Sequence, residues 1–278
     1  MRLVDSHCHL FMDPLAADVA GVLERAAARG VDRVVVPAYD PPSWLAMGDL
    51  AQRPGVSVAV GLHPWAADAQ WSAPGRNGDA TIETAMDSAA RCSALKHALG
   101  GLLQAGMACA VGEIGLDTKV GDEGPSLELQ LEILRVQLEL AADLDRPVIL
   151  HCRGAFAELL DEVKRFDGRL GGVLHAYSRG PDPAHSFIAA GLHIGLGGAI
   201  TRDRAKRVLK AAAQLPLDKI VLETDAPSIG LDGVDPVDTE PQHVRDVAEA
   251  LAALRGETPE MIAEVTTGNA CELFRLRP

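Results

Sequence analysis

The chain has 278 residues, of which 47% are hydrophobic and 23% charged, and its formal net charge is −13 at pH 7. This length suits a barrel of about 250 residues, and the composition is typical of a globular protein. The acidic charge excludes broad electrostatic capture of nucleic acid, although a cleft with metal ions and a few arginines could still hold a phosphate-containing substrate.

The chain shows no signal for a membrane or for secretion. No apolar run approaches the ~20 residues of a membrane helix, and the N-terminus enters the first predicted strand without a signal-peptide pattern. Five cysteines at irregular spacing argue against a disulfide framework. We therefore expect a cytoplasmic protein with no membrane partner.

Strand-like and helix-like segments alternate along the chain. The predicted strands are residues 3–6, 33–37, 56–60, 108–111, 147–150, 172–174, 193–196 and 219–222. The predicted helices are residues 15–29, 42–52, 80–105 with a break near Gly100 and Gly101, 126–144, 154–166, 181–190, 202–214, 240–255 and 258–276. Eight strand–helix units predict a parallel (β/α)8 TIM barrel, with residues 1–278 as a single domain.

Metal-binding side chains gather at the C-terminal ends of these strands. His7 and His9 follow the first strand, and in extended backbone residues i and i+2 point to the same side. The members that follow the fourth, fifth, sixth and eighth strands are Glu113, His151, His175 and Asp225. In a parallel barrel all these ends lie on one face, so the sequence predicts a metal centre there.

Six ligands exceed the three protein ligands of a typical catalytic zinc, so the set favours two divalent ions. Glu113 lies near the middle of the set and could bridge the two ions. A shared water would have a lowered pKa, and Asp225 could also accept its proton, so Glu113 and Asp225 are the predicted catalytic residues. Histidine ligands suit zinc and manganese, whereas magnesium prefers oxygen, so the sequence leaves Mg, Mn and Zn open.

Two further residues are predicted to contact the substrate. His63 ends the third strand on the same face. Arg153 follows His151 by two residues and could clamp a phosphate bidentately, although an ion pair with a neighbouring carboxylate is the alternative. Arg179 and Arg202, in later loops, are weaker candidates of the same kind.

The remaining histidines and the two cysteines beside the ligands are predicted to be structural. Alternation should turn Cys8 and Cys152 away from the neighbouring histidines, so we expect them to pack as small apolar residues. His193 opens a strand and so belongs to the opposite face of the barrel.

With these residues assembled, the chain resembles the TatD family of metal-dependent deoxyribonucleases, within the amidohydrolase superfamily. The matching motifs are Asp-Ser-His-Cys-His-Leu at 5–10, Gly-Leu-His-Pro at 61–64, Gly-Glu-Ile-Gly-Leu-Asp at 112–117, Leu-His-Cys-Arg at 150–153, His-Ala-Tyr-Ser at 175–178 and Glu-Thr-Asp-Ala-Pro at 223–227. The resemblance implies hydrolysis of DNA phosphodiesters with a metal-activated water, often from a 3′ end.

The resemblance also implies how the ligands divide between the two ions. One ion would be held by His7, His9, Glu113 and Asp225, and the other by Glu113, His151 and His175. Some positions depart from the family pattern, and they are Trp65, Thr118, Ala176-Tyr177-Ser178 and Thr239-Glu240-Pro241. The chain is therefore similar to a divergent subgroup, with an expanded helical segment around 72–106.

Two alternatives stay open beside the deoxyribonuclease. In the first, the same metal centre serves the hydrolysis of an amide, ester or lactone. The acidic net charge favours such a substrate, whereas Arg153 argues against it. In the second, the chain is a TatD-like subunit of a larger complex, with a protein partner docking through residues 72–106.

Overall fold

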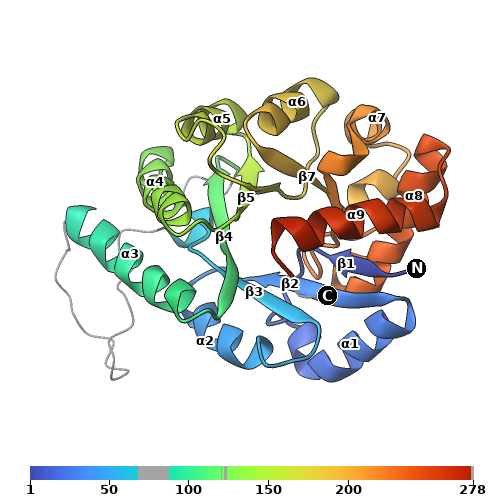
Figure 1. Cartoon of the computed structure of the whole chain (residues 1–278), viewed down its shortest axis with the longest axis horizontal. Coiled ribbons are helices and arrows are strands. Elements are labelled where there is room, and N and C mark those ends of the chain that lie inside the picture. Colours follow the sequence, from blue (N-terminus) through green and yellow to red (C-terminus); the bar gives the residue numbers. More distant parts are fainter. Residues whose placement is uncertain (68–87, 120, 122–123, 277–278) are drawn as a thin grey trace.

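The computed structural model describes residues 1–67, 88–119, 121 and 124–276. In this part eight strands form one sheet, and each strand pairs in parallel with the next along the chain. They are β1 (Leu3–Asp5), β2 (Val31–Pro37), β3 (Val56–Val60), β4 (Ala108–Asp117), β5 (Val148–Arg153), β6 (Gly172–Leu174), β7 (Leu192–Leu196) and β8 (Ile220–Leu222). The sheet curls into a barrel with helices on its outside (Figure 1), which confirms the predicted (β/α)8 fold.

The helices follow the predicted order. They are α1 (Val19–Ala28), α2 (Pro41–Leu50), α3 (Ser88–Gln104), α4 (Leu127–Asp143), α5 (Phe156–Lys164), α6 (Pro181–Ala189), α7 (Lys206–Gln214), α8 (Val244–Arg255) and α9 (Pro259–Leu273). Side-chain caps define several starts, since Ser126 accepts a hydrogen bond from the Leu129 N–H and Thr258 from the Met261 N–H. Among the described helices, none is long and apolar enough to cross a membrane.

The segments that follow β1 and β8 close the barrel. The Ser6 N–H donates to the Leu222 carbonyl at 3.0 Å, the Asp225 N–H donates to the His7 carbonyl at 2.8 Å, and the His9 N–H donates to the Ala226 carbonyl at 2.8 Å. The backbone that closes the barrel is thus the same backbone that carries three of the predicted metal ligands.

The predicted break at Gly100 and Gly101 is wrong, because α3 runs through both glycines. Leu95, Leu99 and Leu103 are fully buried on one face of α3, and this packing outweighs the roughly 1 kcal/mol that each glycine costs a helix relative to alanine. The predicted docking segment 72–106 is described only from residue 88 onward, so residues 72–87 of that prediction lie outside the described part. A partner there stays a prediction.

Strands β4 and β5 extend past their predicted ends at residues 111 and 150, because Leu116 pairs with Cys152 and Asp117 with Arg153. The extension depends on close approach of the two backbones. A Cβ on Gly115 would lie 2.0 Å from the His151 carbonyl oxygen, so only glycine fits there. The glycines that suggest a strand end in the sequence are what allow this strand to continue.

The barrel interior is an apolar layer beneath the metal-binding face. Its buried members include Val35, Ala59, Ala110, Ile149, Val173 and Val221, and Ala270, Phe274 and Leu276 from the C-terminal segment join the same cluster. Helix α9 lies across this end of the barrel (Figure 1). His151 stands two residues after Ile149, and His175 two after Val173, so strand alternation turns both imidazoles inward above the apolar layer.

Phe274→Ala is expected to lower the free energy of unfolding by about 3–5 kcal/mol, because it leaves a cavity in the apolar cluster that Ala270, Phe274 and Leu276 complete. Phe274 is 1% exposed. Urea unfolding of this variant and of a control, Met261→Ala at an exposed position of α9, measures the difference. Equal stability of the two variants would show that Phe274 contributes little to the packing of this cluster.

A polar link joins α4 to α5 on the outside of the barrel. Arg135 donates to Glu162 Oε1 through Nε at 3.0 Å and Nη2 at 2.6 Å, and Arg165 Nη1 donates to Glu162 Oε2 at 2.5 Å. Hydrogen bonds from Arg135, which outweigh desolvation, and from Arg165 lower the pKa of Glu162 below its usual value.

Glu162→Gln is expected to destabilise the protein by about 1 kcal/mol near neutral pH. Because the folded pKa is depressed, the stabilisation is present above the unfolded pKa and is lost as pH falls through the folded value. Urea unfolding at neutral and acidic pH tests this. A difference between wild type and variant that grows on acidification would refute it.

Candidate metal centre

A β-bulge in β4 aims Glu113 at the centre of the ligand set. Val111 pairs with Val148 and Ile114 with Leu150, so three residues along β4 match two along β5. The Glu113 N–H donates instead to the Ala38 carbonyl beyond β2, at 2.9 Å. Bulges redirect side chains in this way, and Glu113 is only 2% exposed.

Glu113 Oε2 faces the ligands contributed by the segments after β1 and β8. His7 Nε2 lies 3.3 Å and His9 Nε2 3.6 Å from this oxygen, and the two nitrogens are 3.2 Å apart. Asp225 Oδ1 is 3.7 Å from His7 Nε2 and 3.2 Å from His9 Nε2. The structure thus brings together the four residues predicted for one ion.

Glu113 Oε1 faces a second group of nitrogens. His175 Nε2 lies at 2.8 Å, His151 Nδ1 at 3.0 Å and His63 Nε2 at 3.3 Å from this oxygen. His151 Nδ1 and His175 Nε2 are 3.3 Å apart. The predicted set for the other ion is therefore assembled too, and His63, predicted as a substrate contact, stands beside it.

The donor set fits divalent cations. Ligand atoms about 2.0–2.2 Å from a tetrahedral ion would lie roughly 3.3–3.6 Å apart, which is close to the separations around Glu113 Oε2. Asp225 Oδ1 is buried and makes no hydrogen bond within the described part of the chain. A buried carboxylate oxygen in that state, facing two imidazole nitrogens, is well suited to a cation.

The surrounding imidazoles control the charge on Glu113. Burial alone would raise the pKa of this carboxyl, but His175, His63 and His7 lower it well below its usual range. Glu113 is therefore ionised at neutral pH, as a metal ligand must be.

Asp117 orients His151 for this role and was not among the predicted site residues. His151 Nε2 lies 3.0 Å from Asp117 Oδ2, so the proton on Nε2 leaves Nδ1 free as a ligand. The indole N–H of Trp65 donates to the same oxygen at 2.9 Å. A sequence signal existed, because Glu113, Gly115 and Asp117 alternate toward one face of a continuous strand.

Comparisons with known proteins agree with this geometry. The chain matches the family model described as TatD related DNase over residues 4–275. The chain belongs to the TatD family. The uncharacterized metal-dependent hydrolase YjjV of Escherichia coli K12 is 34% identical over 276 residues, which cover 99% of this chain and 98% of that protein. The crystal structure of YjjV matches with a TM-score of 0.84 and covers 99% of both chains.

A relative with a more specific name is the human deoxyribonuclease TATDN3. It is 31% identical over 276 residues, which cover 98% of this chain and 94% of that protein. TatD-family membership confirms the resemblance seen in the motifs, and it confirms the predicted class, a metal-dependent hydrolase.

In this TatD-family chain, His63 has a defined protonation pattern. Its Nδ1 accepts a hydrogen bond from the Trp65 N–H at 3.2 Å, and its ring stacks on Tyr39 with centroids 4.7 Å apart. Desolvation lowers the pKa of His63. The neutral ring therefore keeps its proton on Nε2, the atom that faces Glu113 Oε1.

Arg153 lies at the mouth of the site, where the ion pair considered as the alternative to phosphate binding is present. Its side chain is 52% exposed, and its Nη1 is 3.6 Å from Asp117 Oδ2, a loose ion pair. The guanidinium also lies 6.0 Å from the centroid of the Trp65 ring. Arg153, His63 and Asp225 all line a cavity of about 760 Å³, which we call the metal-centre cavity.

The cysteines next to the ligand histidines take different positions. Cys8 is fully buried and its Sγ donates to the Ala226 carbonyl at 3.6 Å, away from the ligand atoms. Cys152 packs against the hydrophobic core but also borders the metal-centre cavity. His193 is the second residue of β7, at the opposite end of the barrel.

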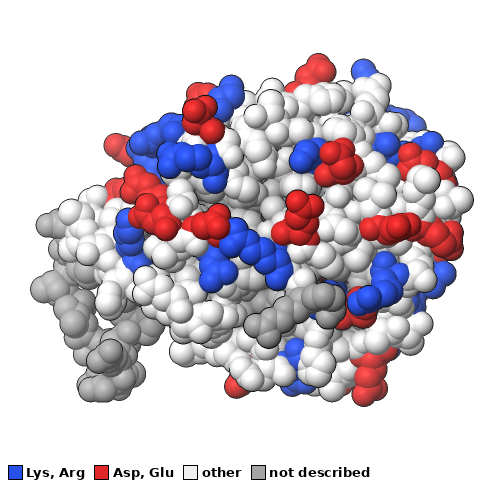
Figure 2. Space-filling view, in the orientation of Figure 1, with Lys and Arg blue, Asp and Glu red and all other residues white. Residues whose placement is uncertain are grey.

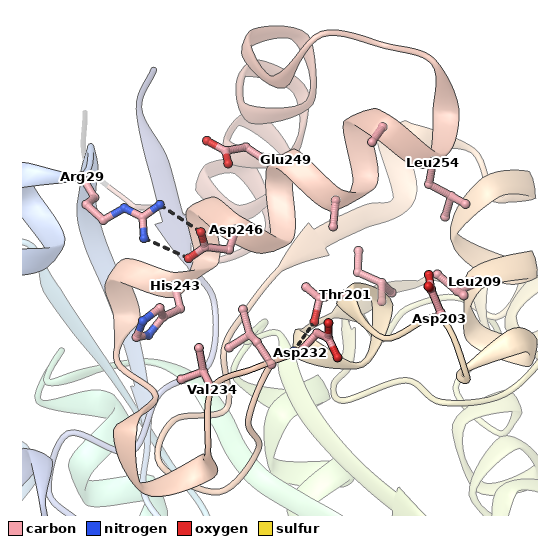
Figure 3. Close-up of a pocket in the computed structure, with 14 residues that line it drawn as sticks. Arg29, Thr201, Asp203, Leu209, Asp232, Val234, His243, Asp246, Glu249 and Leu254 are labelled. Carbon is pink, nitrogen blue, oxygen red and sulfur yellow. Dashed lines mark hydrogen bonds and ion pairs between the residues drawn. The ribbon is translucent and has the colours of Figure 1, made fainter.

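A separate cavity of about 780 Å³ is lined by residues such as Arg29, Thr201 and Asp246 (Figure 3). Arg29 is paired there with Asp246 at 2.9 and 3.0 Å, and the Asp232 N–H donates to Thr201 Oγ1 at 2.8 Å. None of the predicted ligands lines it, so it takes no part in the metal centre.

Asp117→Asn is expected to weaken metal affinity and activity by about 10- to 100-fold, because the neutral amide is a poorer acceptor for the Nε2 proton of His151 and fixes its tautomer less firmly. Metal titration and steady-state rates measure the change. Asp161→Asn, on the exposed face of α5, is the matched control. Unchanged metal affinity in Asp117→Asn would show that His151 needs no such partner.

Proposed function

We propose that this chain is a deoxyribonuclease that hydrolyses phosphodiester bonds at the ends of single-stranded DNA with two divalent metal ions. The observation that carries the proposal is the position of Glu113, whose two oxygens face two separate groups of ligand atoms. The family model described as TatD related DNase and the human relative named as a deoxyribonuclease support this substrate.

His7, His9, Glu113 and Asp225 would hold one ion, and Glu113, His151 and His175 the other. Ions bound there would lower the pKa of a water molecule and stabilise charge on the attacking and leaving oxygens. The four histidines are compatible with zinc and manganese, and the two carboxylates with magnesium.

The chain's own residues supply proton transfer and substrate positioning. Burial raises the pKa of Asp225, but His9 and His7 lower it below its usual value, so this carboxylate is ionised and can take a proton from the attacking water. His63 can donate its Nε2 proton in a hydrogen bond to a phosphate or leaving-group oxygen. Arg153, half-exposed at the mouth, is positioned to clamp the phosphate.

The burial of the centre favours a single-stranded end as substrate. His9, Glu113 and His175 line the metal-centre cavity, and they are only 4%, 2% and 4% exposed. A phosphate in an intact duplex is flanked by paired bases on both sides and would not reach ligands this deep. A single strand can enter with its terminal nucleotide.

A nuclease assay tests the proposal directly. Purified protein is given single-stranded oligonucleotides with Mg²⁺, Mn²⁺ or Zn²⁺, and products are resolved by length. Stepwise shortening that requires metal is the expected result. No cleavage with any of these ions, together with turnover of amide, ester or lactone substrates, would overturn the choice of DNA.

A further inference from the structure

A smaller cavity of about 440 Å³, which we call the basic cavity, is lined by residues that follow closely in the chain on several that line the metal-centre cavity. The loop after β6, the first turn of α6 and the first two turns of α7 form it. Its lining residues are Arg179, Gly180, Pro181, Pro183, Lys206, Arg207 and Lys210. Four of these seven are basic and none is acidic.

The four cations are without a close ion-pair partner in the part of the chain that the structure describes. Among the described residues, no ion pair within 4.0 Å involves Arg179, Lys206, Arg207 or Lys210. Arg179 is instead held over the ring of Phe156, 4.8 Å from its centroid. On the face that α9 covers, by contrast, basic and acidic side chains lie side by side (Figure 2). The net charge of the chain is −13, so this basic cluster stands out from the rest of the molecule. Its positive potential favours the binding of an anionic ligand.

The charges at the start of α7 also oppose the helix dipole. Lys206 and Arg207 occupy the first turn, where no acidic residue and no side-chain cap is present. Basic side chains are unfavourable at a helix N-terminus, and an anion bound beside them would relieve the repulsion. This placement is hard to explain by the stability of α7 alone.

Residues that line the basic cavity follow closely in the chain on residues that line the metal-centre cavity. Ser178 and Arg202 line the metal-centre cavity, and Arg179 and Lys206 line the basic one. The loops after β6 and β7 therefore connect the two cavities on the face where the strands end. Arg202, through Nη2, is tied to the Gly230 carbonyl at 2.6 Å, which fixes one point on that path.

We propose that the basic cavity binds backbone phosphates of the single-stranded DNA whose terminal nucleotide lies at the metal centre. This inference rests on the proposed function. It assigns to Arg179, Lys206, Arg207 and Lys210 the retention of the strand beyond the reacting phosphate. Short substrates that fill only the metal-centre cavity do not use it.

The test compares a long and a short substrate with the triple variant Lys206→Gln, Arg207→Gln and Lys210→Gln. On an oligothymidylate of about 20 nucleotides, kcat/KM should fall about tenfold at low salt, and its log–log salt slope should fall by about 2, roughly 0.7 for each lost phosphate contact. On a thymidine dinucleotide, kcat/KM should stay within about twofold of wild type, which also reports correct folding.

Two further variants separate charge from position. Arg53→Gln, Lys164→Gln and Arg169→Gln together remove the same charge at the opposite end of the barrel and should leave both substrates unaffected. Lys206→Arg, Arg207→Lys and Lys210→Arg together keep the charge and should retain wild-type activity on the oligonucleotide.

The outcomes distinguish the two proposals. If the wild type cleaves DNA but the glutamine triple behaves like the control triple, or loses activity equally on both substrates, the basic cavity is not a phosphate site. If the wild type cleaves neither substrate with any metal, the proposed deoxyribonuclease function fails first. A loss confined to the long substrate with a reduced salt slope supports both.

Discussion

Glu113→Gln is expected to lower kcat by about a thousandfold or more. Glutamine keeps the size of the side chain but removes the charge that two groups of ligands share. Metal stabilisation of the reacting oxygens is worth several kcal/mol, and each 1.36 kcal/mol is about tenfold in rate. Steady-state kinetics on single-stranded DNA, with metal in excess, measure the loss.

The same variant should also hold less metal. Glu113 contributes Oε2 to one group and Oε1 to the other, at 3.3 and 2.8 Å from the nearest imidazole nitrogens. We expect bound metal per chain to fall below the wild-type value in elemental analysis. Glu139→Gln, on the exposed side of α4, is the matched control and should keep both rate and metal. A Glu113→Gln protein with full metal and full activity would remove the bridging role.

Removal of the metal ions is expected to abolish hydrolysis and lower the thermal midpoint by about 10 °C. At a free metal concentration a thousandfold above Kd, binding stabilises the native state by about 4 kcal/mol, and 1 kcal/mol is about 2–4 °C for a chain of 150–250 residues. Without cations, the buried carboxylates depend on imidazole protons for compensation. Calorimetry with and without a chelator measures the shift.

Restoring Mg²⁺, Mn²⁺ or Zn²⁺ separately to the chelated protein should recover activity and stability together. Glu113→Gln serves as the control, and its midpoint should respond less to chelation than that of the wild type. Hydrolysis by a protein shown to be metal-free would contradict the metal-dependent mechanism.

Local patterns in the sequence determined the barrel and its chemical face. Eight alternating strand and helix segments allow few other arrangements, because parallel strands need crossover helices and close into a barrel at this number. The position of each ligand after a strand then followed from topology. His7 and His9 could be placed on one side because strand alternation is a local property.

Distances across the barrel were decided only by the tertiary structure. Strand order places Glu113 on the metal-binding face, but the bulge in β4 aims its carboxylate between His7 and His175. Asp117 was missed because the glycines of β4 resemble a strand end until the close approach of β5 is known. The glycines within α3 were misread for a similar reason, since packing stabilised the helix there.

The basic cavity likewise became apparent only in the tertiary structure. Lys206, Arg207 and Lys210 are close in sequence within α7, but only the tertiary structure brings Arg179, from the loop after β6, to the same cavity. The sequence by itself determined the fold, the family and the set of candidate metal ligands, because these follow from short-range periodicity and motif order. The tertiary structure decided which side chains share a cavity, because packing between distant segments sets those contacts.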